Sequence, residues 1–580
     1  MQKPSNLPSK AEQRVIRQCF EAILFEQLLP YDERPAQNGW KIFTIRGKKH
    51  MYQCLGKRSA FDRVRIQGMP LLSARSGRQA FPRIKDIVED AALSVEKSQA
   101  LYAELSQTVF LSNWNEEYIR GTPSRRMLTY EQLEEAIGEG HPYHPCFKAR
   151  TGFSLEDHQA FGNEAGAGFS LVWLGVKKED VHTYYPEEEQ SFLQKEFGYD
   201  TWKKVVEALC QAGGQLYDYR ILPIHPWQWE TLQNNELKEA VETKDVLYLG
   251  AFGDCYGASQ SIRTVMNKDN PFQAQLKLPL QMINTSSLRT VQSESVAAAP
   301  HLSRWLQEVV AQDPFLCKQH DVRLLKEYAG ASYEPSRYPW IMGNVNVIFR
   351  ESVQSQLQSG ERAVPLNALS LKEKDGSLFI APFLKDFGIE AWLKQLIEVV
   401  VTPVVHLCLI HGIAVEAHGQ NMILILSDTN WPIGVLLRDF HESLEYYEPY
   451  VKEKKSIPQF HEIHSSFKEG AVDDYYWMSS PEALRELIVD TLFVYNLTEL
   501  SWQLECELDF KEDRFWNFVT VSLMRYLQRE NEMNERLHAF HLHKEKMTTE
   551  SLFKKKWTGE KECRHLIRNP IQLEGMYAYR

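Results

Sequence analysis

The sequence predicts an α+β fold in which helices alternate with strands that pair mainly antiparallel. Apolar residues over 11–29 recur at helical spacing, the runs at 169–176 and 219–224 are strand-like, and 421–439 has the pattern of a hairpin. Of the 580 residues, 43% are apolar and 12% are aromatic, which is enough for a large buried core. This composition excludes a disordered chain.

The same periodicities predict the remaining elements in order along the chain. Spacing of three and four residues between apolar positions indicates helices, and alternation or short apolar runs indicate strands. Helices are predicted at 11–29, 85–107, 129–137, 188–211, 287–311, 389–410 and 513–530, and strands at 40–54, 169–176, 219–224, 246–252 and 274–283. We expect a mostly helical segment beyond residue 480 and three domains, 1–137, 138–350 and 351–580.

Charge and cysteine content narrow the class of protein. The formal net charge of -11 makes the chain a poor candidate for binding nucleic acid. The nine cysteines form no paired motif, which indicates reduced thiols instead of a disulfide framework or a zinc site. Residues 1–10 are polar and lack the apolar region of a signal peptide. The apolar stretch 396–415 contains Glu398 and Pro403, so a buried helix is predicted instead of a membrane span, and the protein is expected to be cytoplasmic.

The first polar cluster is GHPYHPCFKARTGFS at 140–154. Its two His-Pro pairs predict a rigid loop, and Ser154 is a predicted N-cap with an acidic residue three positions later. Lys148 and Arg150 then precede a helix N-terminus, an arrangement that favours an anion such as phosphate. A structural turn with solvated cations is the equally weighted alternative. Zinc binding by His141 and His144 is a weaker one, since no further ligands lie nearby.

The second cluster, 259–289, contributes further cations. Arg263 lies in the polar segment SQSIRT. Lys277 lies within a predicted apolar strand, so its side chain is expected either to point into a pocket or to lie at the edge of a sheet. The segment Asn284-Thr285-Ser286-Ser287 is predicted to open the helix 287–311, with Arg289 in its first turn. The helix dipole disfavours a cation there unless an anion lies between them, so either an anion site or an exposed arginine is predicted.

The third cluster is EAHGQN at 416–421, followed by the hairpin and Arg438-Asp439. With the turn centred near residue 430, antiparallel pairing places Asn421 opposite Asp439. Glu416, His418, Asn421 and Asp439 then meet at the open end of one hairpin. Carboxylate and amide oxygens suit Mg²⁺ carrying a nucleotide phosphate, with packing alone as the alternative.

Together the clusters predict a site for a triphosphate and a polyanionic second substrate. HPYHPCFKARTGFS, IHPWQW, SxSIRT, KLPLQMxNTSSLR and EAHGQN…LLRD occur in order across residues 138–440. In these motifs the chain resembles the siderophore synthetases that work without non-ribosomal peptide synthetases, the IucA/IucC family. The resemblance implies an ATP- and Mg²⁺-dependent ligase that activates a carboxylic acid, commonly citrate or a derivative, as an acyl-adenylate and joins it to an amine or hydroxylamine. It also implies a cupped-hand fold of thumb, fingers and palm, a kinase-like palm hairpin, and a homodimer.

The resemblance further implies roles for individual residues. It implies that the nucleotide phosphates are contacted by Ser154, Arg263, Lys277 and Arg289. It also implies that the ATP pocket is lined by His144 and Lys148, and Arg150 belongs there by its position. The resemblance places three residues near the acid substrate and the adenylate: Thr285, Arg289 and His418. With Lys277, which contacts the phosphates, these three are the expected catalytic residues. Glu416, Asn421 and Asp439 hold Mg²⁺, with Gln420 close to the nucleotide.

The loop motif resembles the branch of the family that takes an already acylated intermediate, so a later condensation step is predicted. One alternative is a small-molecule phosphotransferase, because His411-Gly412 before the hairpin resembles a kinase motif, although Ile413 stands where the catalytic Asp belongs. The other is a non-catalytic binding protein for citrate-like anions or ferric siderophores. Glu442, Asp473-Asp474 and the lysines at 554–556 are expected to be surface or structural charges.

Overall fold

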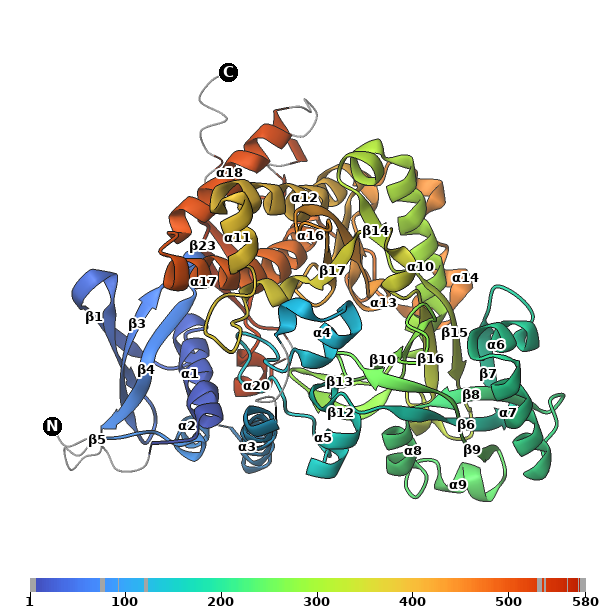
Figure 1. Ribbon diagram of the computed structural model, residues 1–580. Helices are drawn as coiled ribbons and strands as arrows, with labels where there is room; N and C mark the ends of the chain where they lie inside the picture. The colour runs from blue at the N-terminus through green and yellow to red at the C-terminus, as the bar shows by residue number, and fades with distance from the viewer. Residues whose placement is uncertain are drawn as a thin grey trace.

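The computed structural model describes residues 7–573 apart from gaps at 74–78, 92, 119–123, 529–534, 537–538, 561 and 572. Helices and sheets are mixed along the chain, as the α+β prediction requires (Figure 1). The helices are α1 (Lys10–Phe25), α2 (Ile84–Asp90), α3 (Val95–Tyr118), α4 (Tyr130–Ala136), α5 (Leu155–Phe161), α6 (Glu189–Phe197), α7 (Tyr199–Gln211), α8 (Pro226–Leu232), α9 (Lys238–Glu242), α10 (Ser293–Gln312), α11 (Ala381–Phe387), α12 (Ile389–His411), α13 (Phe440–Ser443), α14 (Phe460–Ile463), α15 (Ser466–Glu469), α16 (Pro481–Ile488), α17 (Thr498–Leu508), α18 (Glu512–Leu527) and α20 (Lys554–Thr558).

A five-stranded antiparallel sheet lies at the N-terminal end of the chain, at the left of Figure 1. Helix α1 packs on its strand β4 through buried apolar side chains that include Phe20. The N-cap of α1 is Ser9, whose hydroxyl accepts a hydrogen bond from the backbone of Glu12. The strands, in sheet order, are β1 (Tyr31–Pro35), β2 (Lys41–Arg46), β3 (Met51–Arg58), β4 (Val64–Ser73) and β5 (Gln79–Ala80).

An eight-stranded sheet with a core of its own lies at the lower right of Figure 1. Its buried apolar cluster draws on residues 171–349, and α10 packs against strand β15. The strands, in sheet order, are β7 (Val181–Tyr184), β15 (Glu327–Tyr333), β16 (Asn346–Arg350), β11 (Gln275–Lys277), β10 (Thr264–Asn267), β9 (Val246–Ala258), β6 (Phe169–Lys177) and β8 (Tyr219–Ile224). Strand β11 therefore lies inside the sheet, between β16 and β10.

The predicted hairpin forms part of a four-stranded sheet. Every residue of β19 is buried, which accounts for its continuous apolar run. The sheet order is β14 (Val322–Leu324), β20 (Pro432–Leu437), β19 (Met422–Leu426) and β17 (Arg362–Pro365), with β14 and β20 parallel. Three short pairs complete the described sheets: β12 (Leu280–Asn284) with β13 (Ser287–Arg289), β18 (Ile413–Val415) with β21 (Leu444–Tyr446), and β22 (Lys546–Glu550) with β23 (Arg564–Arg568).

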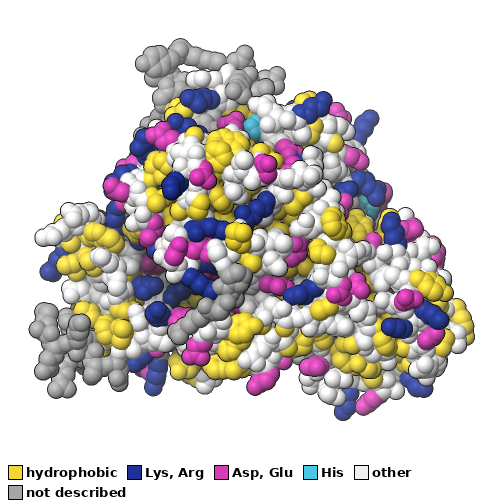
Figure 2. Space-filling model, in the orientation of Figure 1, with side chains coloured by type: hydrophobic (Ala, Val, Ile, Leu, Met, Phe, Trp, Pro, Cys, Tyr) yellow, Lys and Arg dark blue, Asp and Glu magenta, His cyan; other side chains and the backbone are white. Residues whose placement is uncertain are grey.

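Helix α12 is apolar and long enough to cross a membrane, but 78% of its most apolar window is buried inside the protein. The predicted buried helix is confirmed, and it packs against α18 and β20. The apolar cluster around it includes residues of both the N-terminal sheet and the C-terminal helices. Figure 2 shows basic and acidic side chains interspersed over one face of the molecule. The domain boundaries at 137 and 350 stay a prediction.

Four predicted elements differ from the structure. The helix predicted over 85–107 is divided into α2 and α3, and the one predicted over 188–211 is divided into α6 and α7. The strand predicted over 274–283 is interrupted at Pro279, which divides β11 from β12. The helix predicted over 287–311 begins only at Ser293, because Asn284 pairs with Ser287 and the chain turns tightly with Thr285 at a φ of 63°. Arg289 therefore ends a β-hairpin instead of lying in a first helical turn, and the helix-dipole argument for an anion beside it was wrong.

Candidate functional site

The predicted site residues of the second and third clusters meet where strand β11 faces the end of the β19–β20 hairpin. Lys277, on β11, places its Nζ 3.3 Å from Oδ1 of Asp439 and 3.4 Å from Oε2 of Glu442. Arg263, just before β10, binds both carboxylate oxygens of Glu442 at 2.5 and 2.6 Å. The eight-stranded sheet thus supplies cations, and the chain that follows the hairpin supplies carboxylates.

The hairpin register differs by one residue from the prediction. Met422 pairs with Leu437, and the N–H of Arg438 donates to the carbonyl of Asn421 at 3.2 Å, so Asn421 lies opposite Arg438. An irregularity between Ile425 and Leu426 shifts the pairing. Asp439 follows with a φ of 65°, a strained left-handed conformation for a residue other than glycine. This turn brings the Asp439 carboxylate to the cations.

The EAHGQN segment is organised by local hydrogen bonds. Nδ1 of His418 accepts the backbone N–H groups of Gln420 and Asn421 at 3.1 and 3.2 Å. The side-chain amide of Asn421 donates to Oε2 of Glu416 at 3.2 Å, and Nε2 of His418 lies 3.8 Å from the same oxygen. Nδ1 of His418 is thereby used as an acceptor, and Nε2 of the same ring faces the Glu416 carboxylate.

Two residues of the site were missed or misread from the sequence. Glu442, expected to be a surface or structural charge, binds Arg263 and Lys277. Arg350, at the end of β16, donates to Oδ1 of Asp439 at 2.7 Å. The only sequence signal for Glu442 is its place one turn after Asp439. Arg350 carries none, because its proximity arises from the pairing of β16 with β11.

The cations hold both carboxylates in the ionised form. Burial alone would raise the pKa of Asp439, but Lys277, Arg350 and Arg438 together lower it well below its ordinary value. Burial likewise opposes ionisation of Glu442, and Arg263 and Lys277 outweigh it, so its pKa is lowered. Burial, reinforced by Arg263, lowers the pKa of Arg289 to about 10. The site therefore contains opposed full charges in a mostly buried setting.

A buried ion pair lies beneath this chain segment. Nδ1 of His441 is 2.6 Å from Oε1 of Glu327, and the backbone N–H of His441 donates to the other oxygen at 3.2 Å. Both side chains are fully buried. Nε2 of His441 lies 3.8 Å from Oε1 of Glu442 and has no hydrogen-bond partner in the part of the chain that the structure describes. Glu327 thus fixes the short helix α13, which follows Asp439 and carries Glu442.

Three buried guanidinium donors around the site lack hydrogen-bond partners among the described residues: Nε of Arg263, Nε of Arg289 and Nε of Arg438. Arg289 donates through NH2 to the carbonyl of Asn284 at 3.0 Å. Thr285 occupies the strained turn of this hairpin and is half-buried. Unsatisfied buried donors are costly, so they fit a site that completes its hydrogen bonds with an anionic ligand.

The first cluster is arranged differently from the prediction. Lys148 and Arg150 are buried, and both bind Glu164; the guanidinium of Arg150 lies 2.8 Å from Oε2. They are therefore neither solvated nor free, and Glu164 was missed because nothing in its local sequence marks it. The N-cap prediction is confirmed, since Ser154 Oγ accepts from the backbone of Asp157, with a reciprocal bond at 2.9 Å.

His144 and Gln420 complete the predicted set. His144 is fully buried, its Nδ1 accepts the N–H of Cys146 at 3.1 Å, and its ring packs edge-on against Phe553 of the C-terminal segment. His141 uses Nδ1 to accept two backbone N–H groups. Gln420 is half-buried beside His418. The role of each predicted residue toward a nucleotide stays a prediction.

The site opposes cations to carboxylates, and comparison with known proteins assigns the class of the chain. The model of the IucA / IucC family matches residues 129–371, and that of the ferric iron reductase FhuF-like transporter matches residues 390–565. A Bacillus anthracis citryl-spermidine/3,4-dihydroxybenzoyl-citryl-spermidine:spermidine ligase is 33% identical over 96% of this chain and 93% of its own. A Vibrio mimicus aerobactin synthase is 32% identical over 92% of this chain and 90% of its own.

Solved structures agree. The petrobactin biosynthesis protein AsbB from Bacillus anthracis str. Sterne superposes with a TM-score of 0.91 at 33% identity, covering 97% of this chain and 95% of its own. The aerobactin synthetase IucC of Klebsiella pneumoniae shares the fold, with a TM-score of 0.82 at 23% identity over 97% of this chain and 98% of its own. The chain belongs to the IucA/IucC family. It is an ATP-dependent ligase of siderophore biosynthesis.

Proposed function

We propose that this ligase activates a carboxyl group of a citrate-derived acid as an acyl-adenylate and condenses it with an amine. The observation that carries the proposal is the set of opposed charges in which Lys277, Arg263 and Arg350 are held against Asp439 and Glu442. In the first half-reaction a carboxylate oxygen attacks the α-phosphorus of ATP, and pyrophosphate leaves. In the second, the amine attacks the acyl carbon, and AMP and a proton are released.

The charges of the cleft suit this chemistry. Attack of a carboxylate on a phosphate brings two anions together, and cations fixed in advance reduce that repulsion without reorganising. Arg263 and Lys277 are each paired with a carboxylate, so an incoming triphosphate would exchange places with Glu442. Nε of Arg289, which has no partner among the residues described here, gives a further donor for a phosphate or for the acid. His418 places Nε2 next to Glu416, at the side where the acid is proposed to bind.

Glu416, Asn421 and Asp439 are proposed to hold Mg²⁺. Two carboxylates and an amide oxygen are hard ligands of the kind that Mg²⁺ takes together with substrate phosphates. Bound there, Mg²⁺ would neutralise phosphate charge. Asp439 is ionised in this environment. The side-chain nitrogen of Asn421 donates to Glu416, so the side-chain oxygen of Asn421 remains available to a metal ion.

We propose further that the acid substrate already carries one amide, so that the enzyme catalyses a later condensation step. One similar protein supports this assignment by name, since the Bacillus anthracis protein is a citryl-spermidine/3,4-dihydroxybenzoyl-citryl-spermidine:spermidine ligase. The Vibrio mimicus relative is named as an aerobactin synthase. Both cover more than nine tenths of this chain. The cupped-hand architecture, the homodimer and the cytoplasmic location are part of the same proposal.

Product analysis tests the proposal. Purified protein is incubated with Mg²⁺ATP, hydroxylamine as acceptor, and either citrate or a monoamide of citrate. We expect AMP, pyrophosphate and a hydroxamate, with the monoamide turned over faster than citrate. ADP and a phosphorylated product would support the phosphotransferase alternative, and nucleotide-independent binding of citrate without turnover would support the binding protein. Faster turnover of free citrate would contradict the later step alone.

A further inference from the structure

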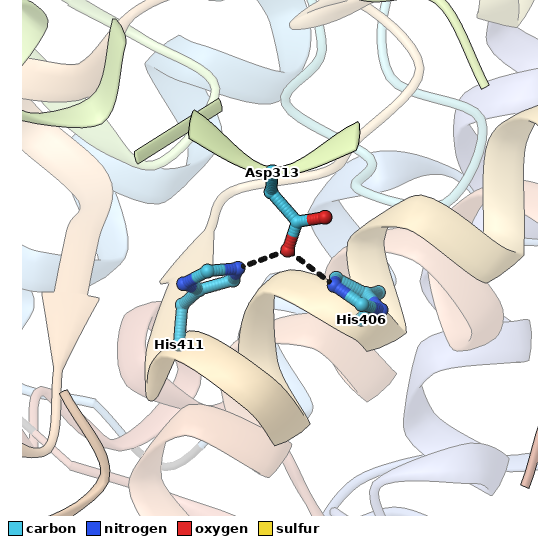
Figure 3. Close-up of side chains that lie close together, drawn as sticks. All are labelled: Asp313, His406 and His411. Atoms are coloured by element: carbon cyan, nitrogen blue, oxygen red, sulfur yellow. Dashed lines mark hydrogen bonds and ion pairs between the residues drawn. The ribbon is translucent and has the colours of Figure 1, made fainter. Parts of the chain in front are cut away.

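A second cluster of metal-binding side chains lies at the junction of α10 and α12. Asp313 is the residue that ends α10, and His406 and His411 come from the last turns of α12. Nε2 of His406 is 2.9 Å and Nε2 of His411 is 2.7 Å from the same oxygen, Oδ2 of Asp313. Figure 3 shows both imidazoles pointing at that oxygen from either side. We propose that these three residues bind one divalent transition-metal ion.

The donor set suits such an ion. Two imidazoles and one carboxylate are typical ligands of Zn²⁺, Co²⁺ and Fe²⁺, and three protein ligands leave positions open for solvent or a further ligand. Donors around a tetrahedral ion, at about 2.0 Å each, lie about 3.3 Å apart. The distances from the two Nε2 atoms to Oδ2 of Asp313 are about half an ångström shorter than this donor–donor distance. Rotation of the two imidazole rings can lengthen them by that amount.

The state of the three groups also suits metal binding. Burial lowers the pKa of His406 to about 4 and lowers that of His411. Burial would raise the pKa of Asp313, but the hydrogen bonds from both histidines outweigh it and lower the pKa to about 2. The two Nε2 atoms and the carboxylate are already gathered at one point, and the proton that each Nε2 shares with Asp313 has to move to Nδ1 or leave when the ion binds.

The surroundings provide an orienting partner and a route of entry. Nδ1 of His406 is 2.7 Å from the hydroxyl of Tyr526. Once Nε2 binds an ion, Nδ1 carries the ring proton and donates a hydrogen bond to this hydroxyl oxygen. His411 and Asp313 line a cavity of about 610 Å³, together with Glu308, Lys452 and Glu453. An ion can enter through this cavity, and its open coordination positions would face it.

Lys452 gives the proposal an internal check. It is exposed, and its charge lowers the pKa of both histidines, so it also repels a cation bound between them. Removing that charge with Lys452→Gln is expected to tighten metal binding about threefold, which is the scale of one solvent-screened charge. Hydrogen bonds that merely join two helices give no reason for this effect.

The experiment uses the full-length protein with Zn²⁺ alone or Co²⁺ alone and without nucleotide. Calorimetry is expected to give one equivalent of Zn²⁺, and Co²⁺ to show the visible bands of an imidazole-bound ion. Both signals should be lost in Asp313→Asn and in His411→Gln, and affinity should fall about tenfold in Tyr526→Phe. His301→Gln, which removes an exposed histidine of α10, is the control and should bind as wild type does. Circular dichroism and Tm identify any variant that fails to fold.

A further variant separates this site from the proposed Mg²⁺ site. Glu416→Gln should keep the full Zn²⁺ stoichiometry. Loss of Zn²⁺ in Glu416→Gln with retention in His411→Gln would place the ion at the nucleotide site and overturn the inference. Absence of binding by wild-type protein would overturn it equally.

Discussion

Arg350 donates a hydrogen bond of 2.7 Å to Asp439, although Arg350 ends β16 of the eight-stranded sheet and Asp439 follows β20 of the four-stranded sheet. The guanidinium is fixed from behind by Gln275, whose side-chain oxygen accepts from Nε and NH2 at 3.2 and 2.7 Å. Gln275 and Arg350 are direct partners in the β11–β16 ladder. The eight-stranded sheet thus holds its cations rigidly against the hairpin, and the contact between Arg350 and Asp439 joins the two halves of the proposed site.

The first prediction concerns the carboxylate of that contact. Asp439→Asn keeps the shape of the side chain but removes the charge that faces Lys277 and Arg350 and that is proposed to hold Mg²⁺. We expect kcat for AMP formation to fall about 10²- to 10³-fold. Pyrophosphate release at saturating Mg²⁺ATP measures it. Asp428→Asn, in the exposed turn of the same hairpin, is the matched control and should keep full activity. Wild-type turnover by Asp439→Asn would remove Asp439 from the mechanism.

The second prediction concerns Glu442, which neutralises Arg263 and Lys277 when no nucleotide is bound. Glu442→Gln leaves two largely buried cations with less compensation, so Tm without ligand should fall by a few degrees. An anionic ligand then has more to neutralise, so ATP should raise Tm by more in the variant than in wild type. Differential scanning fluorimetry with and without ATP gives both values. An unchanged ATP-induced shift would show that triphosphate does not displace Glu442.

The third prediction concerns the buried pair of Glu327 and His441. Glu327→Gln removes the charge of a fully buried carboxylate that accepts two hydrogen bonds from His441, which should cost about 2 kcal/mol of unfolding free energy. Because His441 lies between Asp439 and Glu442 in sequence, activity should fall as well. Urea denaturation and pyrophosphate release measure the two effects.

The double variant Glu327→Leu with His441→Leu separates stability from positioning. Two apolar side chains in place of a buried ion pair often restore stability. We expect the double variant to be more stable than Glu327→Gln but still impaired in AMP formation. Recovery of both properties together would mean that the pair acts only through stability.

The parts of the site that were predictable from the sequence are those carried by local patterns. Ser154 as an N-cap and the β19–β20 hairpin depend on neighbouring residues, and both are confirmed. The position of Arg289 failed because Thr285 adopts a positive φ that its side chain disfavours, so propensity indicated a helix where the chain forms a hairpin. Such strain depends on tertiary contacts and leaves no local signal.

The sequence also showed no sign of which charged residues pair over long distances along the chain. Glu164 follows the Lys148 loop by 16 residues, and Arg350 precedes Asp439 by 89. Each partner was invisible because a single sequence does not specify how loops fold back on one another, as for Glu164, or the order of strands in a sheet, as for Arg350. The types of residue in the cleft were therefore predictable, whereas the pairing between them was not.

The last prediction follows from the buried cluster of Lys148 and Glu164. Burial lowers the pKa of Lys148 from 10.5 to about 8, so between these two values the unfolded chain binds a proton that the folded protein has released. Unfolding free energy should therefore rise with pH across this window, by up to about 3 kcal/mol from this group. In Lys148→Met that part of the rise should disappear. Urea denaturation at pH 7.5, 9 and 10 measures the difference between the two proteins, in which other titrating groups cancel. Parallel pH profiles would mean that Lys148 keeps its proton in the fold, held by Glu164, and would make the cluster a permanent ion pair.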